Sequence, residues 1–219
     1  PSYFQKLINT IIKDLRYHHC LGYFDDLPCM GQTFNNFCDS LDLLLQQLEN
    51  YNLKARISKC LFGLTSIDFL GHTVSGIGIR PSSEKIQALK DLPYPITAKQ
   101  LQSQLGFYNY FSRFIPNYAK LAGPLYRLIS KERKFKILQE DKQSLDEMKK
   151  ALMNTSLLVH FDPDKEIKLA VDASNFAVGG ILMQNNGQTP SIDDGENKRK
   201  EIWCPISYFS QVLKKHQVN

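Results

Sequence analysis

The chain has 219 residues, more than the roughly 100–150 residues of a typical domain, so two or three modules are expected. Hydrophobic residues make up 42% and charged residues 22%, with 13 Phe and 10 Tyr, which excludes a disordered chain and provides material for real cores. The net charge of +5 permits a polyanionic partner without requiring one.

The N-terminal quarter of the chain predicts two helices with a hairpin between them. Apolar residues recur at spacings of three and four over residues 2–17, which is the stripe of an amphipathic helix. Tyr23 and Phe24 then lead into Asp25-Asp26, and we expect a strand whose tip is this acidic pair, within a short hairpin. The helical period returns over residues 33–50.

The middle of the chain changes from strands to helices. Residues 54–80 contain short apolar pieces punctuated by glycines, which predicts strands and tight turns. A capping-type start at Pro81-Ser82 begins a helical region, so we place a module boundary near residue 80. Thr97 and Gln100 form a capping box at the next helix, and further helices are expected over 118–130 and 140–153.

The last part of the chain is predicted to be rich in strands. The segments IKLAVDAS and VGGILMQ alternate like neighbouring antiparallel strands, WCPISYFS resembles a third, and this module is expected to start near residue 158. The polar segment 185–201 between them is interpreted as a solvated loop. Helices and strands in separate runs indicate an α+β fold.

Cysteine usage and apolar run length indicate the cellular environment. The five cysteines lack CxxC or paired histidine spacing, so neither a zinc site nor a disulfide framework is indicated. We therefore expect reduced thiols and an intracellular protein, in the cytoplasm or nucleus. No apolar run approaches the roughly 18 residues that cross a membrane, so no membrane partner is expected. The chain begins without Met and stops abruptly, which suggests a piece of a longer protein.

The adjacent carboxylates Asp25 and Asp26 are the first candidate for chemistry. Magnesium is a hard cation that takes oxygen ligands and clamps phosphates in two-metal nucleotidyl transfer. Successive side chains of a strand point to opposite faces, so both carboxylates approach one metal only if a tight turn bends the backbone there. Taken alone, an Asp-Asp pair is more often an exposed turn.

Several ordered segments carry a resemblance to a known family. Tyr23-Phe24-Asp25-Asp26 resembles the YxDD box of reverse transcriptases, and the surrounding blocks follow the gypsy-type LTR retrotransposon pattern in register. These blocks are PSYFQKLI, NLKARISKCLFG, FLGHTVSGIGIRPSSEKI and LQSQLGFYNYFSRFIPNYAKLAGPLYRL, so the resemblance covers essentially the whole chain. It implies a partial polymerase palm over 1–80, a helical thumb and connection over 81–157, and the first strands of an RNase H-like domain over 158–219.

The resemblance also implies two metal sites. Asp25 and Asp26 are expected to be two of the three polymerase carboxylates that bind Mg2+, with the third upstream of Pro1. Asp172, in LAVDAS, resembles the first metal-binding aspartate of the RNase H fold, whose other carboxylates are expected beyond Asn219. An aspartate after a strand is, taken alone, usually a turn or cap residue.

The resemblance further implies contacts with nucleic acid, each with a structural alternative. Tyr23 is expected beside the primer terminus, or packed under the turn. Phe69-Leu70-Gly71 is expected to form a primer grip, or to be simply a strand ending in a turn. Lys59 could contact phosphates, although a charged face is more often solvated. The aromatic residues between 107 and 118 favour a helix core over a stacking platform, and Arg113 is the better candidate for a phosphate contact.

The expected function of the parent protein is RNA-directed DNA polymerase with an appended RNase H. Its partners would be an RNA template, a DNA primer, the RNA–DNA hybrid and deoxynucleoside triphosphates. We expect the chain alone to be inactive. The alternative is a catalytically inactive retroelement-derived module that binds nucleic acid or a host protein partner, motivated by Pro28. Because proline lacks a backbone donor, it is expected to distort the second arm of the hairpin or to place it at an edge.

Overall fold

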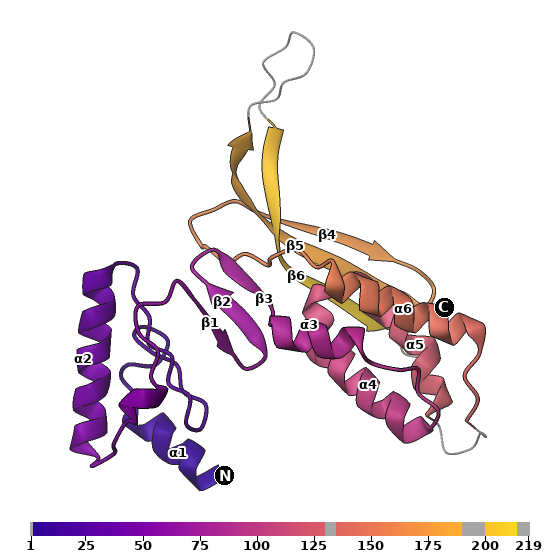
Figure 1. Cartoon of the computed structure of the whole chain (residues 1–219). Coiled ribbons are helices and arrows are strands. Elements are labelled where there is room, and N and C mark those ends of the chain that lie inside the picture. The colour runs from indigo at the N-terminus through magenta and orange to yellow at the C-terminus, as the bar shows by residue number, and fades with distance from the viewer. Residues whose placement is uncertain (1, 130–134, 190–199, 214–219) are drawn as a thin grey trace. The chain divides into compact units, whose positions relative to one another are not determined.

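The computed structural model describes residues 2–129, 135–189 and 200–213, and these contain both helices and strands (Figure 1). The chain divides into two compact units, Pro1–Leu70 and Gly71–Asn219. Within the described residues, no helix is both long and apolar enough to cross a membrane. The three-module division at residues 80 and 157 stays a prediction.

The first unit is built from two helices and the segments between and after them. Its elements are α1 (Ser2–Ile11), α2 (Phe34–Asn50), the short 3-10 helix η1 (Ile57–Lys59) and β1 (Ser66–Phe69). Thr33 caps α2 by accepting a hydrogen bond from Asn36 N–H. The apolar stripes of the two helices meet in one buried cluster, whose members are Ile8, Ile11, Ile12, Leu15, Cys20, Leu44 and Leu48.

The predicted helix over 2–17 is shorter in the structure. Regular α-helix ends at Ile11, and less regular turns continue beyond it, through the bond from Arg16 N–H to Ile12 O at 2.8 Å to the bond from His19 N–H to Leu15 O at 2.9 Å. Within these turns Tyr17 adopts a left-handed conformation with φ of 72°, which is incompatible with a continuous α-helix. The apolar stripe is nevertheless used in full, because Leu15 is buried.

The second unit begins with a hairpin and continues as a helical bundle. The strands β2 (His72–Ser75) and β3 (Gly78–Pro81) pair antiparallel. The helical elements that follow are α3 (Ser83–Lys90), α4 (Ala98–Tyr110), η2 (Ser112–Phe114), α5 (Tyr118–Leu128) and α6 (Gln139–Met153). Ser82 and Thr97 accept N-cap hydrogen bonds from Lys85 and Gln100, so the predicted helix starts are confirmed.

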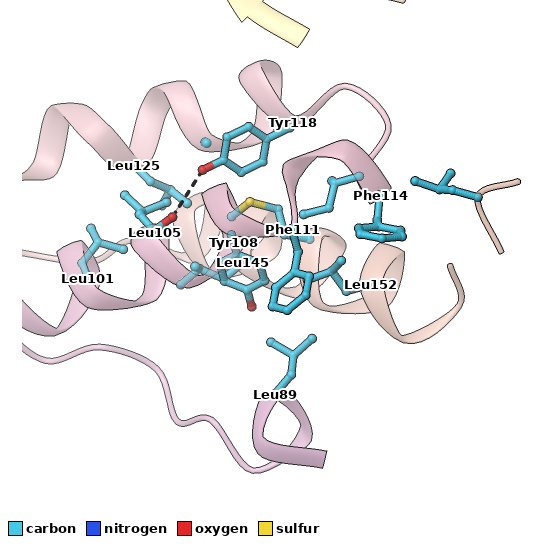
Figure 2. Packing of buried hydrophobic residues seen from close by; sticks show 14 residues of the cluster. Leu89, Leu101, Leu105, Tyr108, Phe111, Phe114, Tyr118, Leu125, Leu145 and Leu152 are labelled. Carbon is cyan, nitrogen blue, oxygen red and sulfur yellow. Dashed lines mark hydrogen bonds between the residues drawn. The ribbon is translucent and has the colours of Figure 1, made fainter. Parts of the chain in front are cut away.

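Aromatic and aliphatic side chains from these helices form the largest core (Figure 2). Tyr108, Phe111, Phe114 and Tyr118 are all buried in it, which confirms core packing for these four aromatics. The Tyr118 hydroxyl donates to Leu105 O at 3.4 Å. Burial raises the pKa of Tyr118, and hydrogen bonding to Tyr126 adds to the increase.

A three-stranded antiparallel sheet completes the second unit. Its order is β4-β5-β6, with β4 at Ile167–Ala173, β5 at Ala177–Thr189 and β6 at Lys200–Val212. The sheet packs on the helices, as Figure 1 shows, and Ala119 N–H at the start of α5 donates to Ser210 Oγ of β6 at 3.0 Å. Every residue of β4 is exposed. The Lys168 ammonium lies 5.4 Å from the centre of the Trp203 ring.

The interpretation of residues 185–201 as a loop is wrong at both ends. β5 continues to Thr189 and β6 starts at Lys200, with Asn185 opposite Trp203 and Gln188 opposite Glu201 across a bulge. Pairing between neighbouring strands supplies hydrogen bonds that the polar composition of the segment did not predict. Residues 190–199 of the predicted loop lie outside the described part of the chain.

Candidate functional site

The acidic pair lies at the end of a β-hairpin. Tyr23 and Asp26 form a hydrogen-bonded pair, in which each backbone N–H donates to the other residue's carbonyl oxygen at 3.0 Å. Phe24 and Asp25 are therefore the two central residues of the turn. The predicted hairpin is present, although its arms are joined by isolated bridges rather than by regular strands.

Pro28 removes one hydrogen bond from the hairpin and leaves its register intact. Leu21 N–H still donates to the Pro28 carbonyl oxygen at 3.0 Å. Beyond the proline, Met30 N–H donates to His19 O at 2.9 Å, in the same register. The proline ring thus removes one backbone donor, and the isolated bridges on either side of it keep a single register.

The side chain of Gln5, on α1, holds the turn. Phe24 has a positive φ of 52°, a conformation that costs a non-glycine residue about 1–3 kcal/mol unless its surroundings impose it. Gln5 Oε1 accepts a hydrogen bond from Phe24 N–H at 2.7 Å, and Gln5 Nε2 donates to Gly22 O at 3.2 Å. One side chain therefore binds the backbone on both sides of Tyr23, directly before the left-handed Phe24.

Gln5 was not among the predicted site residues, although the sequence carries a signal for it. Gln5 lies three residues before Ile8 and seven before Ile12, on the stripe of α1 that faces the core. A glutamine at a position where the pattern demands an apolar residue indicates a specific polar partner under the helix. That partner is the backbone of the hairpin turn.

Gly22 brings the first arm of the hairpin against α1. A Cβ added at this glycine would lie 2.7 Å from Ile12 Cδ1 and 2.8 Å from Ile8 Cγ2. These separations are shorter than carbon–carbon contact of about 3.5–4.0 Å, so no larger residue fits without a shift. The close packing of Gly22 and the bonds of Gln5 together fix the hairpin on α1.

The two carboxylates are exposed at this hairpin end. Asp25 occupies the second central position of the turn and Asp26 starts the second arm, and both side chains are exposed. The turn thus supplies the bend that adjacent carboxylates need to serve one metal region. In the part of the chain that the structure describes, no third His, Cys, Asp or Glu joins them in a potential metal cluster. Their oxygen donors fit part of a magnesium ligand set.

Tyr23 lies beside the acidic pair and is available to a ligand. Its side chain is 46% exposed, and its ring meets the Phe24 ring edge-on, with centroids 4.7 Å apart and an interplanar angle of 81°. Tyr23 is therefore not buried under the turn. A contact with a primer terminus remains a prediction.

The segment Phe69-Leu70-Gly71 forms a tight turn. Leu70 and Gly71 have positive φ values of 50° and 74°, which is the signature of a two-residue I′ turn between strands. Gly71 O accepts a hydrogen bond from Ser82 N–H at 2.9 Å, which joins Gly71 to the start of α3 within the second unit. Phe69 is half-buried and Leu70 is exposed. Their predicted role as a primer grip stays a prediction.

The remaining predicted site residues lie in both units. Lys59 ends η1 in the first unit and is exposed. Arg113 is exposed in η2 of the second unit, where its guanidinium carbon lies 5.9 Å from the centre of the Phe114 ring. Asp172 lies in β4 of the second unit, opposite Gly179, and its side chain is exposed. The structure thus brings Asp25 and Asp26 together and describes Asp172 as part of a separate unit.

Two sequence profiles match this chain. The profile of reverse transcriptase (RNA-dependent DNA polymerase) matches residues 1–74, which include the hairpin. The profile of the RNase H-like domain found in reverse transcriptase matches residues 138–193, which include Asp172. The chain is also 31% identical, over its whole length, to the retrovirus-related Pol polyprotein from transposon 297 of Drosophila melanogaster. The chain belongs to the gypsy-type retrotransposon reverse transcriptases.

Other similar proteins agree with this family. The transposon Tf2-3 polyprotein of Schizosaccharomyces pombe is 32% identical over the whole chain. This reverse transcriptase segment spans 19% of the transposon 297 polyprotein and 16% of the Tf2-3 polyprotein. The family assignment, the reverse transcriptase and RNase H-like domains and the retrotransposon origin predicted from the sequence are thereby confirmed.

Solved structures show the same fold. The foamy viral protease-reverse transcriptase in complex with double-stranded DNA matches the whole retrotransposon segment with a TM-score of 0.79 at 23% identity, over 36% of its own chain. The foamy viral enzyme in complex with RNA/DNA hybrid matches with a TM-score of 0.77 over 28% of its chain. The predicted α+β fold of a reverse transcriptase is confirmed by this likeness.

Proposed function

We propose that this segment contributes to both catalytic regions of an RNA-directed DNA polymerase with RNase H. The observation that carries the proposal is the exposed Asp25-Asp26 pair at the end of a hairpin whose turn is hydrogen-bonded to Gln5 of α1. Residues 1–80 would form part of the palm, 81–157 the thumb and connection, and 158–219 the first strands of the RNase H domain.

Asp25 and Asp26 would hold Mg2+ as two of the polymerase carboxylates. The metal would supply charge neutralisation for the phosphates in nucleotidyl transfer from a deoxynucleoside triphosphate. The contribution of the chain is the position of the two carboxylates, which depends on the strained Phe24 turn and on the two bonds from Gln5. Tyr23, exposed beside them, would contact the primer terminus or the incoming nucleotide.

Nucleic acid would be the partner of both units. The foamy viral enzyme has been solved in complex with double-stranded DNA and with RNA/DNA hybrid, and the net charge of +5 is compatible with such polyanions. The Phe69-Leu70-Gly71 turn would approach the primer backbone closely, since glycine carries no side chain. Exposed Lys59 and Arg113 would contact phosphates.

Asp172 would be the first metal-binding aspartate of the RNase H site. It lies near the end of β4, where its exposed carboxylate is open to solvent. One carboxylate does not make a two-metal site, so the remaining ligands would come from other parts of the polyprotein.

The test uses the full Pol polyprotein that contains this segment. Asp25→Asn should lower primer extension on an RNA template with Mg2+ by at least roughly a hundredfold, because several kcal/mol of charge stabilisation depend on the metal. Asp172→Asn should instead remove cleavage of the RNA strand and leave extension intact. Asp39→Asn, at an exposed position of α2, is the matched control and should change neither activity.

Unchanged extension by the Asp25→Asn polyprotein would overturn the assignment of the polymerase metal site. If the wild-type polyprotein itself failed to extend a primer but bound RNA–DNA hybrid with a steep salt dependence, the inactive nucleic-acid-binding module would be favoured instead.

A further inference from the structure

Two cysteines face each other across the base of the hairpin. Cys20 and Cys29 are antiparallel bridge partners. The hydrogen bonds lie on either side of them, from Leu21 N–H to Pro28 O and from Met30 N–H to His19 O. Cys20 and Cys29 are therefore a non-hydrogen-bonded pair, the closer of the two kinds of antiparallel pair.

The geometry of such a pair is compatible with a disulfide. Opposed α-carbons in a non-hydrogen-bonded pair lie about 4.5 Å apart, at the short end of the roughly 4.4–6.8 Å that disulfides span. Both side chains also lie on the same side of the hairpin, because Cys20 belongs to the buried cluster of the first unit and Cys29 packs against it. Directly opposed residues on one face have their Cβ atoms within reach of each other.

We propose that Cys20 and Cys29 are a redox-sensitive pair that closes a reversible disulfide across the base of the Asp25-Asp26 hairpin. The oxidant is a small-molecule disulfide of the glutathione class. The half-buried Cys29 thiolate attacks it and releases one small thiol; the Cys20 thiolate then attacks Cys29 Sγ and releases the second. Two protein thiols and one small disulfide thus become one protein disulfide and two small thiols, with both electrons passing to the oxidant.

The surroundings of the two thiols make the reaction slow rather than forbidden. Burial, with a smaller contribution from Cys29, raises the pKa of Cys20 to about 11, and burial also raises the pKa of Cys29. A raised pKa lowers the thiolate fraction at neutral pH, and the thiolate is the attacking species. The pair therefore reacts slowly with the oxidant at neutral pH, and its oxidation requires sustained exposure.

The disulfide would act on the hairpin and not on the carboxylates directly. It encloses residues 20–29, so the turn with Asp25 and Asp26 becomes a closed loop anchored in the core. Closing a loop restricts the open states of that segment. This inference does not depend on the proposed enzymatic function, since it rests on thiol placement alone.

The direct test maps disulfides in the wild-type 219-residue chain after equilibration in oxidised and reduced glutathione, followed by alkylation of free thiols. No Lys or Arg lies between Tyr17 and Leu53, so a tryptic digest leaves Cys20, Cys29 and Cys38 in one peptide. Chymotrypsin after Tyr23 or Phe24 separates Cys20 from Cys29. A disulfide-linked pair of peptides carrying Cys20 and Cys29, which reduction releases, is the expected result.

The proposal would be overturned if Cys20 and Cys29 were both still alkylated at a glutathione redox potential that oxidises small dithiols. A disulfide from Cys20 or Cys29 to Cys38 or to another molecule would also overturn it. Cys38→Ser is the matched control in the same region and should retain the Cys20–Cys29 link. Cys29→Ser should lose it, and circular dichroism checks that this variant is folded. The wild-type mapping decides the question even where a variant fails to fold.

Hydrogen exchange tests the consequence. In the oxidised wild-type chain the backbone amides of residues 20–27 and of Cys29 should exchange roughly tenfold more slowly than in the reduced chain, because the closed loop has fewer open states. The helix α4 in the second unit serves as the internal reference and should not change. Equal amide exchange rates of the hairpin in the oxidised and reduced chains would contradict the proposed effect of the disulfide.

Discussion

Replacing Gln5 with alanine should loosen the hairpin that carries the acidic pair. The change removes the bond to Phe24 N–H at 2.7 Å and the bond to Gly22 O at 3.2 Å. Each neutral hydrogen bond contributes about 0.5–1.5 kcal/mol, so the free energy of local opening should fall by about 1–3 kcal/mol. The left-handed Phe24 would then lack the contact that imposes its conformation.

Hydrogen exchange with mass spectrometry measures this effect locally. A loss of about 1–3 kcal/mol corresponds to roughly 5- to 150-fold faster exchange of the paired Tyr23 and Asp26 amides, since about 1.4 kcal/mol is a factor of ten. Asn9→Ala is the matched control, because Gln5 Nε2 also donates to Asn9 Oδ1 at 3.0 Å while both bonds to the turn remain. The control should change hairpin exchange by less than about twofold.

Two results would refute this reasoning. Hairpin exchange in Gln5→Ala equal to wild type would mean that the turn holds itself without Gln5. An equal acceleration in Asn9→Ala would mean that the effect comes from α1 as a whole and not from the two bonds to the turn.

Three further predictions concern the second unit. Gly78→Ala should lower the free energy of unfolding of this unit, measured by urea titration, by roughly 2–5 kcal/mol, because Gly78 has a φ of 151° and an added Cβ would overlap Leu158 O. The control Gly76→Ala has open space around the added methyl group and should lower it by less than about 1 kcal/mol. Met148→Ala, in the core, should cost about 2–5 kcal/mol, against less than about 1 kcal/mol for the 40% exposed Met153→Ala, and equal losses would contradict the packing. Folding raises the pKa of Tyr118 above its ordinary value of 10.0. The neutral Tyr118 hydroxyl therefore contributes fully to the free energy of unfolding below pH 10, and this contribution is lost as the pH rises above that value. Above pH 10 the free energy of unfolding of Tyr118→Phe should therefore fall less steeply with pH than that of the wild type, by up to about 1.4 kcal/mol per pH unit. Equal slopes of the free energy of unfolding against pH in the two proteins would contradict this.

The sequence predicted those parts of the fold that depend on local patterns. The helix starts at Ser82 and Thr97 follow from capping chemistry, and the strands β4 and β5 follow from alternation, so each was visible in a short window. The extension of β5 and β6 through polar residues was missed because it depends on pairing between segments distant in sequence.

The acidic residues of the candidate site could be predicted from the sequence, but the residues that hold the hairpin in place could not. Asp25 and Asp26 stand next to each other in a recognisable box, so their residue type and spacing identify them. The role of Gln5 depends on a left-handed Phe24, a backbone conformation that sequence patterns rarely reveal for an aromatic residue. The close fit of Gly22 against Ile8 and Ile12 likewise exists only after folding.

Trp203, in β6, is an intrinsic fluorescence probe at a known position in the fold. Trp203 is the single tryptophan of the sequence, its indole N–H donates to Glu201 Oε2 at 2.9 Å, and it belongs to the second unit. Intrinsic fluorescence excited at the indole band therefore reports on the sheet, while far-ultraviolet circular dichroism reports on the helices of both units. Denaturation curves from the two signals would coincide only if the two units lose their structure together.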